Sequence, residues 1–393
     1  MRASDPMDDA GLTDVVEETG WDSLADLLHL PYPFFAKTLF LLGYDFSSNI
    51  YVITGDYVTI IDPGNDYTAF MDLFALGFKP TDIKKIVLTH GHMDHVMGIF
   101  ELFRRYNCEG RNLEIILHEA GPQEFKELAR QKGCNLTEIK GGETLDLSGF
   151  DLEVLHTPGH TLDGICLYHA ASRTMFTGDT VLPHAMAEMD PSAGGRLDHY
   201  LYSIRTLLKK DIENVMPGHG GIVGRIGKPV VEDTYEGLIK KVVGLETPWM
   251  DGAVTLAQQG LLNESLFYTN KDLVANPDNQ QALEMKAFLL VDLARNDEAI
   301  VIFDKILQQD SRHFHALLGK GRALLGMGGF PASLGYFDQA LAINPQDPEA
   351  LINKGMALYL SGRHDEALDI EVFQKEFAHR IKQELAGKPM ASA

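Results

Sequence analysis

The chain has 393 residues, 45% of them hydrophobic and 9% aromatic, which is enough apolar material for two or three packed domains. Its formal net charge of −22 argues against broad binding to nucleic acid or to anionic membranes. An acidic N-terminus, the lack of an apolar run of roughly 20 residues, and cysteines without metal-type spacing predict a cytoplasmic protein with free thiols at Cys108, Cys134 and Cys166.

Short β-rich runs alternate with helical stretches between about residues 37 and 240. Strands are predicted in NIYVITGDYVTIIDPG, which holds two, and in IKKIVLT, LEIILHEA, FDLEVLHTPG, ICLYHA, RTMFTGD and IENVMPGHGG. Helices are predicted in DYTAFMDLFALGF, VMGIFELFRRY and YLYSIRTLLKKD. This alternation predicts helices layered over β-sheets.

The sequence beyond residue 228 is helical in pattern and repeats with a period of 34 residues. Ala282, Ala316 and Ala350 are in register at that spacing. The same register aligns small residues and Leu or Phe at further positions, namely Ala287, Gly321 and Gly355; Leu290, Leu324 and Leu358; Ala299, Ser333 and Ala367; and Phe303 with Phe337. Small residues let paired helices approach closely while the large ones fill the space between them, so each unit needs neighbours.

This period and pattern resemble the tetratricopeptide repeat over roughly residues 246–380, with a weaker first unit around Trp249. The resemblance implies an all-α solenoid. Such a solenoid binds a peptide or partner protein, or else brings two copies of the chain together, and both uses stay open. The expected organisation is an extension over residues 1–36, a catalytic domain over 37–240, the repeats over 246–380, and a tail over 381–393.

The stretch THGHMDH places three histidines and an aspartate directly after a predicted strand. In extended backbone, His90 and His92 project to the same side. His160 in TPGHTLDG, Asp179 in FTGDTV and His219 in MPGHGG each follow a strand-like run and lie beside glycine. Open α/β layers bind ligands beyond strand ends, and imidazole with carboxylate suits Zn, Fe or Mn. The sequence therefore predicts a metal site, and its seven candidate ligands suit two ions roughly 3.5–4 Å apart.

THGHMDH, TPGH, TGDT and PGHG, in this order, resemble the metal motifs of the metallo-β-lactamase superfamily. The resemblance covers about residues 37–240 and implies an α/β fold, a four-layer αβ/βα sandwich with metals in a groove at one edge. Asp62 in IIDPG would orient a ligand from outside the metal shell. By resemblance, the first metal is held by His90, His92 and His160, the second by Asp94, His95 and His219, and Asp179 bridges the two.

The resemblance implies a hydrolase with two divalent ions, zinc first, with iron or manganese as alternatives. Hydroxide bridging the ions would attack an ester or thioester carbonyl, and Asp94 would position the water or carry a proton to the leaving group. The segment around His160 resembles glyoxalase II-like hydrolases, although Asp163 stands where that group has glycine. The glutathione-binding set of true glyoxalase II is not recognisable after His219.

Three other functions stay open. The chain could be a metal-dependent nuclease or phosphodiesterase, a mononuclear iron dioxygenase acting on persulfides, or a scaffold acting through its repeats. We expect a small ester or thioester as substrate, a protein or second copy at the repeats, and neither membrane nor nucleic acid as partner. The loop after Asp179, VLPHAMAEMDPSAGGRLDHY, is expected either to be an ordinary surface loop or to form a mobile substrate wall lined by His184, Met186, Met189 and Tyr200.

Overall fold

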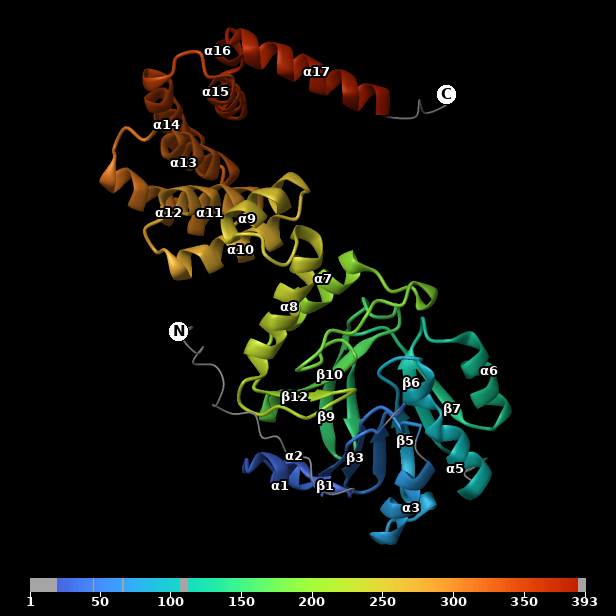
Figure 1. The fold of residues 1–393 in the computed structure, drawn as a ribbon. Helices are drawn as coiled ribbons and strands as arrows, with labels where there is room; N and C mark the ends of the chain where they lie inside the picture. Colours follow the sequence, from blue (N-terminus) through green and yellow to red (C-terminus); the bar gives the residue numbers. More distant parts are fainter. Residues whose placement is uncertain (1–19, 45, 66, 107–111, 388–393) are drawn as a thin grey trace, which may run out of the picture. The chain divides into compact units, whose positions relative to one another are not determined.

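The structure, a computed structural model, describes residues 20–44, 46–65, 67–106 and 112–387. Cys108 and the ends of the chain lie outside these residues. Two compact units divide the chain, Met1–Ile239 and Lys240–Ala393 (Figure 1). No helix in the described part of the chain is long and apolar enough to cross a membrane. The boundaries expected at residues 36, 246 and 380 stay predictions.

The first unit contains a seven-stranded sheet whose strand order follows the sequence, β1 to β7. Neighbours from β1 to β4 are antiparallel, and neighbours from β4 to β7 are parallel. The carboxyl ends of β4, β5 and β6 therefore share one edge of the sheet. The strands are β1 (Asp22–Ser23), β2 (Thr38–Leu41), β3 (Ile50–Thr54), β4 (Val58–Ile61), β5 (Ile83–Val87), β6 (Glu114–His118) and β7 (Asn135–Ile139).

A second sheet of five strands has the order β12-β11-β10-β9-β8. Because β10 is antiparallel to both β9 and β11, and β12 is parallel to β11, the strands β9, β11 and β12 run in the same direction. Their carboxyl ends also share one edge. The strands are β8 (Thr144–Leu147), β9 (Phe150–His156), β10 (Ile165–His169), β11 (Thr174–Gly178) and β12 (Asn214–Pro217).

The two sheets face each other across a core of alternate strand residues, such as Ile61 and Val87 from the first sheet and Val154 and Phe176 from the second. The other face of the first sheet packs on α3 (Tyr67–Ala75), α5 (Gly98–Tyr106) and α6 (Gln123–Gln131). Behind the second sheet, α7 (Leu197–Leu207) is tied to the loop after β9, since Ser203 Oγ donates to the Pro158 carbonyl at 2.6 Å. It is followed by α8 (Gly227–Val243). The α/β four-layer αβ/βα sandwich is thus confirmed.

The chain before residue 37, expected to be an extension, packs into this unit from residue 21 on. It forms β1, α1 (Leu24–Leu28) and α2 (Pro33–Ala36). Leu24, Phe34 and Phe35 are buried in the core between the sheets. These aromatic and aliphatic side chains therefore contribute to the core between the sheets.

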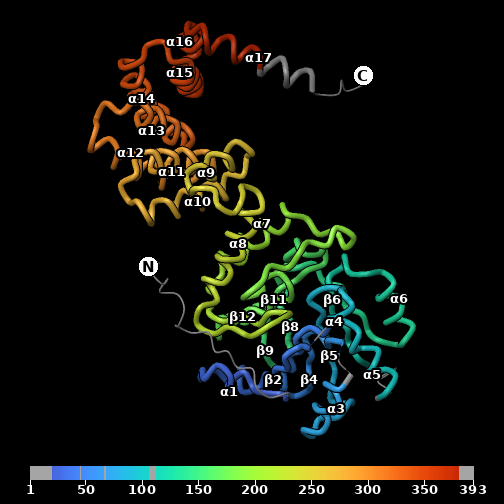
Figure 2. Tube along the Cα trace, viewed as in Figure 1, coloured from blue at the N-terminus to red at the C-terminus, as the bar shows by residue number. Residues whose placement is uncertain are grey.

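The second unit is a run of paired helices, which Figure 2 traces along the chain. Helices α11, α13 and α15 begin at Gln280, Phe314 and Pro348, at the 34-residue spacing of the sequence repeat. This confirms the all-α tetratricopeptide-like array. The helices are α9 (Trp249–Gln258), α10 (Leu262–Ala275), α11 (Gln280–Asp292), α12 (Asn296–Gln309), α13 (Phe314–Gly326), α14 (Phe330–Ile343), α15 (Pro348–Leu360), α16 (His364–Leu368) and α17 (Glu371–Gly387).

Close packing explains the small residues in the repeat register. A Cβ on Gly321 would lie 2.5 Å from the buried ring of Phe337, and one on Gly355 would overlap Phe373. In the last unit the helix is interrupted after α16, and Phe373 at the start of α17 supplies the ring that Phe337 supplies in the unit before.

Candidate metal centre

Five loops meet at one edge of the sandwich; four carry the predicted ligands, and the loop after β4 carries Asp62. The five loops follow β4, β5, β9, β11 and β12, the strands whose carboxyl ends point to that edge. Backbone hydrogen bonds join the loops: Ile165 N donates to the Thr89 carbonyl at 2.8 Å, and Gly218 N to the Gly178 carbonyl at 2.7 Å. Two sheets with different topologies thus present their loops to a single site.

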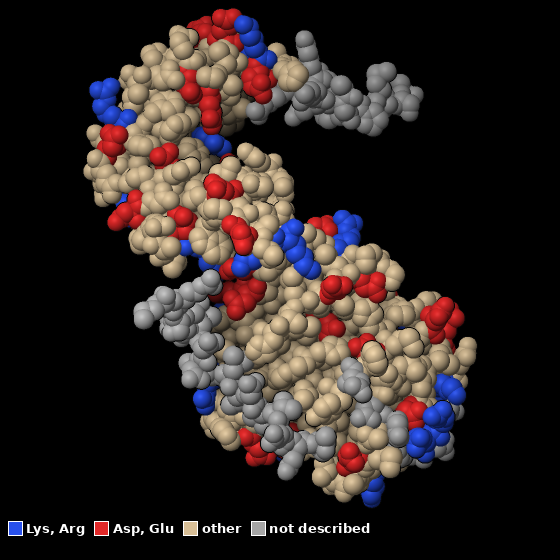
Figure 3. All heavy atoms as spheres, in the orientation of Figure 1, with Lys and Arg blue, Asp and Glu red and all other residues tan. Residues whose placement is uncertain are grey.

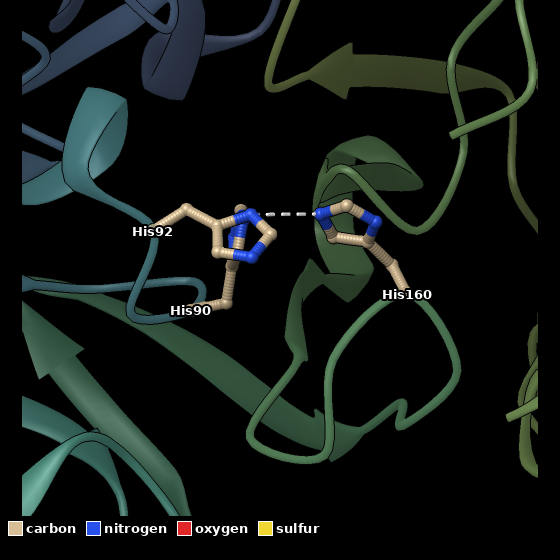
Figure 4. A group of neighbouring side chains, drawn as sticks. All are labelled: His90, His92 and His160. Atoms are coloured by element: carbon tan, nitrogen blue, oxygen red, sulfur yellow. Dashed lines mark hydrogen bonds between the residues drawn. The ribbon is translucent and has the colours of Figure 1, made fainter. Parts of the chain in front are cut away.

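A first group consists of His90, His92 and His160, whose candidate ligand atoms all lie within 4.8 Å of one another. Figure 4 shows His90 and His92 entering from one loop and His160 from the facing loop. The Nε2 atom of His160 lies 3.0 Å from Nδ1 of His92.

A second group consists of Asp94, His95 and His219, again with ligand atoms within 4.8 Å of one another. His219 Nε2 lies 3.0 Å from Asp94 Oδ2. Asp179 lies between the groups, with Oδ1 at 3.4 Å from His95 Nε2 and Oδ2 at 3.7 Å from His160 Nε2. All seven residues expected from the sequence therefore converge.

Hydrogen bonds outside the cluster fix the ring orientations of three histidines. His95 Nδ1 lies 2.8 Å from Asp62 Oδ2, and His160 Nδ1 lies 2.5 Å from the Glu188 carbonyl. His92 Nε2 lies 3.1 Å from Asp190 Oδ2. In each pair the oxygen can only accept a hydrogen bond, so the ring nitrogen that points away from the cluster, the outer nitrogen, carries the proton. The other ring nitrogen, the inner nitrogen, then presents a lone pair to the cluster.

This proton arrangement tests whether a cation fits. With neutral rings, His92 Nδ1 and His160 Nε2 are both acceptors, 3.0 Å apart, and a cation between them would satisfy both. His90 Nε2, His95 Nε2 and Asp179 Oδ1 are also buried without a hydrogen-bond partner among the described residues. Buried polar atoms without partners are costly, and these three atoms, together with the facing nitrogens of His92 and His160, match the donor set of a transition-metal site.

Residues 43–219 match the family model of the metallo-beta-lactamase superfamily, and residues 318–375 match that of the tetratricopeptide repeat. Residues 43–219 are a metallo-β-lactamase superfamily domain. The tetratricopeptide match lies within the second unit. The two matches therefore fall in different units of the chain.

Relatives of the metallo-β-lactamase domain include an atrochrysone carboxyl ACP thioesterase of Passalora fulva, 28% identical over 47% of this chain and 52% of the relative. The chain spans about half the length of the first curated relatives it matches. "Probable metallo-hydrolase MJ0888" of Methanocaldococcus jannaschii is 28% identical over 47% of this chain and 94% of its own. A metallo-β-lactamase family protein of Thermus thermophilus is 21% identical, covering 62% of this chain and 91% of its own, with a TM-score of 0.41.

Electrostatics in the metallo-β-lactamase domain favour the protonation states that cations need, neutral imidazole and ionised carboxylate, at His90 and Asp179 and oppose them at His95. Burial, reinforced by His95, lowers the pKa of His90 well below its usual value. Burial alone would also lower the pKa of His95, but Asp179 and Asp62 outweigh it and raise that pKa well above its usual value. Burial would raise the pKa of Asp179, whereas His95 and His90 bring it below the usual range. The site thus keeps Asp179 ionised and His90 neutral.

The loop after Asp179 differs from the expected mobile wall. Tyr200, expected to line that wall, is buried, and its hydroxyl donates to the Asp179 and Thr180 carbonyls at 3.2 and 2.9 Å. Met186 lies beside Gly237 of α8. Tyr200 therefore supports the backbone of a predicted metal ligand and does not face the substrate, so that expectation was wrong.

Sequence reasoning missed Asp190 altogether. This aspartate belongs to no metal motif, and it reaches His92 across 98 positions of sequence. Its hydrogen bonds from Ser192 and then from His92 lower the pKa of the Asp190 carboxyl to about 2. The Asp-Pro-Ser sequence around it is a turn signal, but a turn signal does not say which histidine the loop meets.

Proposed function

We propose that this chain is a metal-dependent hydrolase that cleaves acyl thioesters or esters with two divalent cations. The observation that carries the proposal is the convergence of seven histidine and aspartate side chains from four loops, three of them with buried ligand atoms that have no hydrogen-bond partner among the described residues. His90, His92 and His160 would hold one cation and Asp94, His95 and His219 the other, with Asp179 between them. When bound, such ions supply a nucleophilic water at neutral pH and polarise a carbonyl oxygen.

The predicted ligands differ in their exposure to solvent, so the site has a buried side and an open side. The Asp179 side chain is 10% exposed, whereas those of Asp94 and His219 are 30% and 33% exposed. A substrate would therefore approach over Asp94 and His219. His219, by hydrogen bonding, and His95 overcome the effect of burial and lower the pKa of Asp94, so this carboxylate is ionised and available to accept a proton. We assign Asp94 to accept a proton from the attacking water and to pass it to the leaving group.

The choice of thioester as substrate rests on relatives that are named ACP thioesterases. These relatives resemble this chain over about half of their own length, so the identity of the acyl group and of its carrier is a separate question. A phosphodiester of nucleic acid has less support, because the chain is strongly acidic and acidic and basic side chains are interspersed on the face drawn in Figure 3.

For the repeat unit we propose partner binding or self-association. Tetratricopeptide arrays expose an extended surface made by successive helix pairs. Both occupants stay open, and the length of the array, α9 to α17, suits either.

The test is a substrate panel run with metal analysis. Purified protein, its metal content determined, is assayed with acyl thioesters, p-nitrophenyl esters, a lactone, a phosphodiester and glutathione persulfide. Thioester or ester turnover that is lost in Asp179→Ala supports the proposal. Turnover of only the phosphodiester or the persulfide would replace it with the corresponding alternative. Absence of both bound metal and turnover would leave the repeats as the functional part.

A further inference from the structure

The loop between β11 and α7 hydrogen-bonds to His160 and His92 of the first group, through the ring nitrogens that point away from the cluster. The Glu188 carbonyl lies 2.5 Å from His160 Nδ1, and Asp190 Oδ2 lies 3.1 Å from His92 Nε2. The same loop is tied to the chain beside His160, because Asp190 N donates to the His160 carbonyl at 2.8 Å. The sequence left open whether this segment is an ordinary surface loop or a substrate wall, and in the structure it is hydrogen-bonded to two predicted ligands.

The second oxygen of Asp190 is fully used within the loop. Asp190 Oδ1 accepts hydrogen bonds from Ser192 N at 2.8 Å, Ser192 Oγ at 2.6 Å and Ala193 N at 3.3 Å. In addition, Gly195 N donates to the Asp190 carbonyl at 2.7 Å, closing the loop around this residue. The carboxylate is therefore held in place by backbone groups before it meets His92.

The two groups are built alike in this respect. In the second group, Asp62 Oδ2 holds His95 through its Nδ1, and the Thr89 amide and hydroxyl hold Asp62 at 2.8 and 2.6 Å. In the first group, Asp190 holds His92 through its Nε2. Each group thus has one histidine paired with a carboxylate that is itself anchored by hydrogen bonds. Asp62 belongs to the family's strand-end motif, whereas Asp190 belongs to no motif.

We infer that Asp190 is a positioning residue for the first cation: it fixes His92 in the tautomer and ring orientation that direct Nδ1 to the metal. A histidine with a free outer nitrogen can place its proton on either nitrogen and can rotate its ring, and both changes remove the ligand atom. A carboxylate on the outer nitrogen prevents both and makes the inner nitrogen more basic. This inference rests on the proposed assignment of His92 to the first cation.

The test measures affinity for Zn²⁺ by competition with a chromophoric chelator on the full chain. Asp190→Ala should weaken one of the two Zn²⁺ sites about 10- to 100-fold, the usual effect of removing such an outer partner, and leave the other unchanged. Asp190→Asn keeps the oxygen that accepts from Ser192 and Ala193 and turns its NH2 group, which cannot accept, toward His92, so it should weaken the same site as Asp190→Ala does. Because the loop's own hydrogen bonds are kept in this variant, the loss separates orientation of His92 from a simple loss of structure.

Two controls address the loop and the charge. Ser192→Ala removes one hydrogen bond to Asp190 Oδ1 and leaves Oδ2 on His92, so both Zn²⁺ affinities should stay as in the wild type. Asp198→Ala deletes the same charge nearby, from a carboxylate that pairs with Arg196, and should also leave them unchanged.

The outcomes distinguish this inference from the proposed function. A wild-type protein that binds no Zn²⁺ contradicts the proposed function itself. A wild-type protein with two sites, both retained in Asp190→Ala, overturns only the role of Asp190. An equal loss in Ser192→Ala would also overturn it, because the loop and not the contact with His92 would then control the affinity.

Discussion

His95 lies between two acidic residues that are far from it in sequence, and one of them, Asp62, hydrogen-bonds to its ring. Its ring is buried, with Nδ1 2.8 Å from Asp62 and Nε2 3.4 Å from Asp179. Asp62 comes from the end of β4, Asp179 from the end of β11, and His95 from α4 (Met93–Val96), the turn after β5. A single side chain thus connects loops of both sheets, so its position depends on the packing of the whole sandwich.

Gly218 lies where no side chain can be accommodated. A Cβ there would overlap Asp179 Oδ1 and lie 2.8 Å from Cε1 of His95. We predict that Gly218→Ala displaces the Asp179 carboxylate, weakens metal binding at least tenfold and reduces hydrolysis with it, while the fold survives. Zn²⁺ competition titration and far-ultraviolet circular dichroism would measure the two effects.

Gly221 is the matched control for that substitution. It lies three residues further along the same loop, and a Cβ there meets nothing within 4 Å. Gly221→Ala should keep wild-type Zn²⁺ affinity. If the Gly218 and Gly221 variants behave alike, the close approach of the loop to Asp179 is not what holds the site together.

Cys166 should be inert in the folded protein. Burial raises the pKa of the Cys166 thiol to about 11, partly opposed by a hydrogen bond with Thr157. A raised pKa leaves little thiolate below pH 10, about 240-fold less at pH 8 than for an ordinary thiol of pKa near 8.5. Alkylation by iodoacetamide, followed by peptide mass mapping, should therefore spare Cys166 until a denaturant is added.

Rapid alkylation of Cys166 in the native state at pH 8 would contradict this placement. Cys134 is likewise a buried thiol outside any disulfide, whereas Cys108 lies outside the described residues.

The site could be predicted from sequence only where motifs carry it. THGHMDH and the three later motifs follow strand ends, and strand direction alone then brings the seven residues to one edge. Asp190 and Tyr200 could not be assigned, because their roles depend on how an irregular loop folds back onto His92 and Asp179. No periodicity in the sequence encodes that path.

The repeat helices depend on glycine where one helix meets the ring of the next. Gly321 in α13 faces Phe337 in α14, and a Cβ would come within 2.5 Å of its ring. Because Phe337 is fully buried and cannot move aside, we predict that Gly321→Ala destabilises the repeats by about 1–3 kcal/mol, the usual cost of overpacking. Urea denaturation followed by circular dichroism would measure it.

Gly335, in the same helix pair, gives the opposite expectation. It lies within α14, and a Cβ there meets nothing within 4 Å. Gly335→Ala should be neutral or stabilising by about 0.5–1 kcal/mol, since alanine is the better helix former. If both variants were equally destabilised, the contact with the Phe337 ring would not be responsible.

The repeats and most strands were predicted from sequence, but several elements were missed, among them β2 and the amphipathic helix α6. The 34-residue period gave the paired helices from α11 on, and the apolar runs gave the central strands. We did not predict β7 or β8, whose sequences NLTEI and TLDL carry few apolar residues, or the short β1. Such strands are defined by pairing with a neighbour, and pairing is not encoded locally.

At the scale of the whole molecule, the two units should be separable in function. A chain ending at residue 245 keeps all of α8, which ends at Val243, and removes the repeats. Because the predicted metal ligands all lie in the first unit, we predict that this shortened chain still hydrolyses small thioesters. It should no longer bind a partner or self-associate. Steady-state kinetics and sedimentation velocity would measure these two properties.

Complete loss of hydrolysis in a shortened chain that remains folded would contradict that independence. It would mean that the repeats contribute part of the active site.

The most direct test of the central claim is a zinc titration of metal-depleted protein, followed by the rate of acyl-thioester hydrolysis. We predict a rate near zero without metal that rises to a plateau at two equivalents of Zn²⁺ per chain. The Asp179→Ala variant should stay inactive throughout. Hydrolysis that does not depend on added metal, or no hydrolysis at any Zn²⁺ concentration, would contradict the proposed two-cation hydrolase.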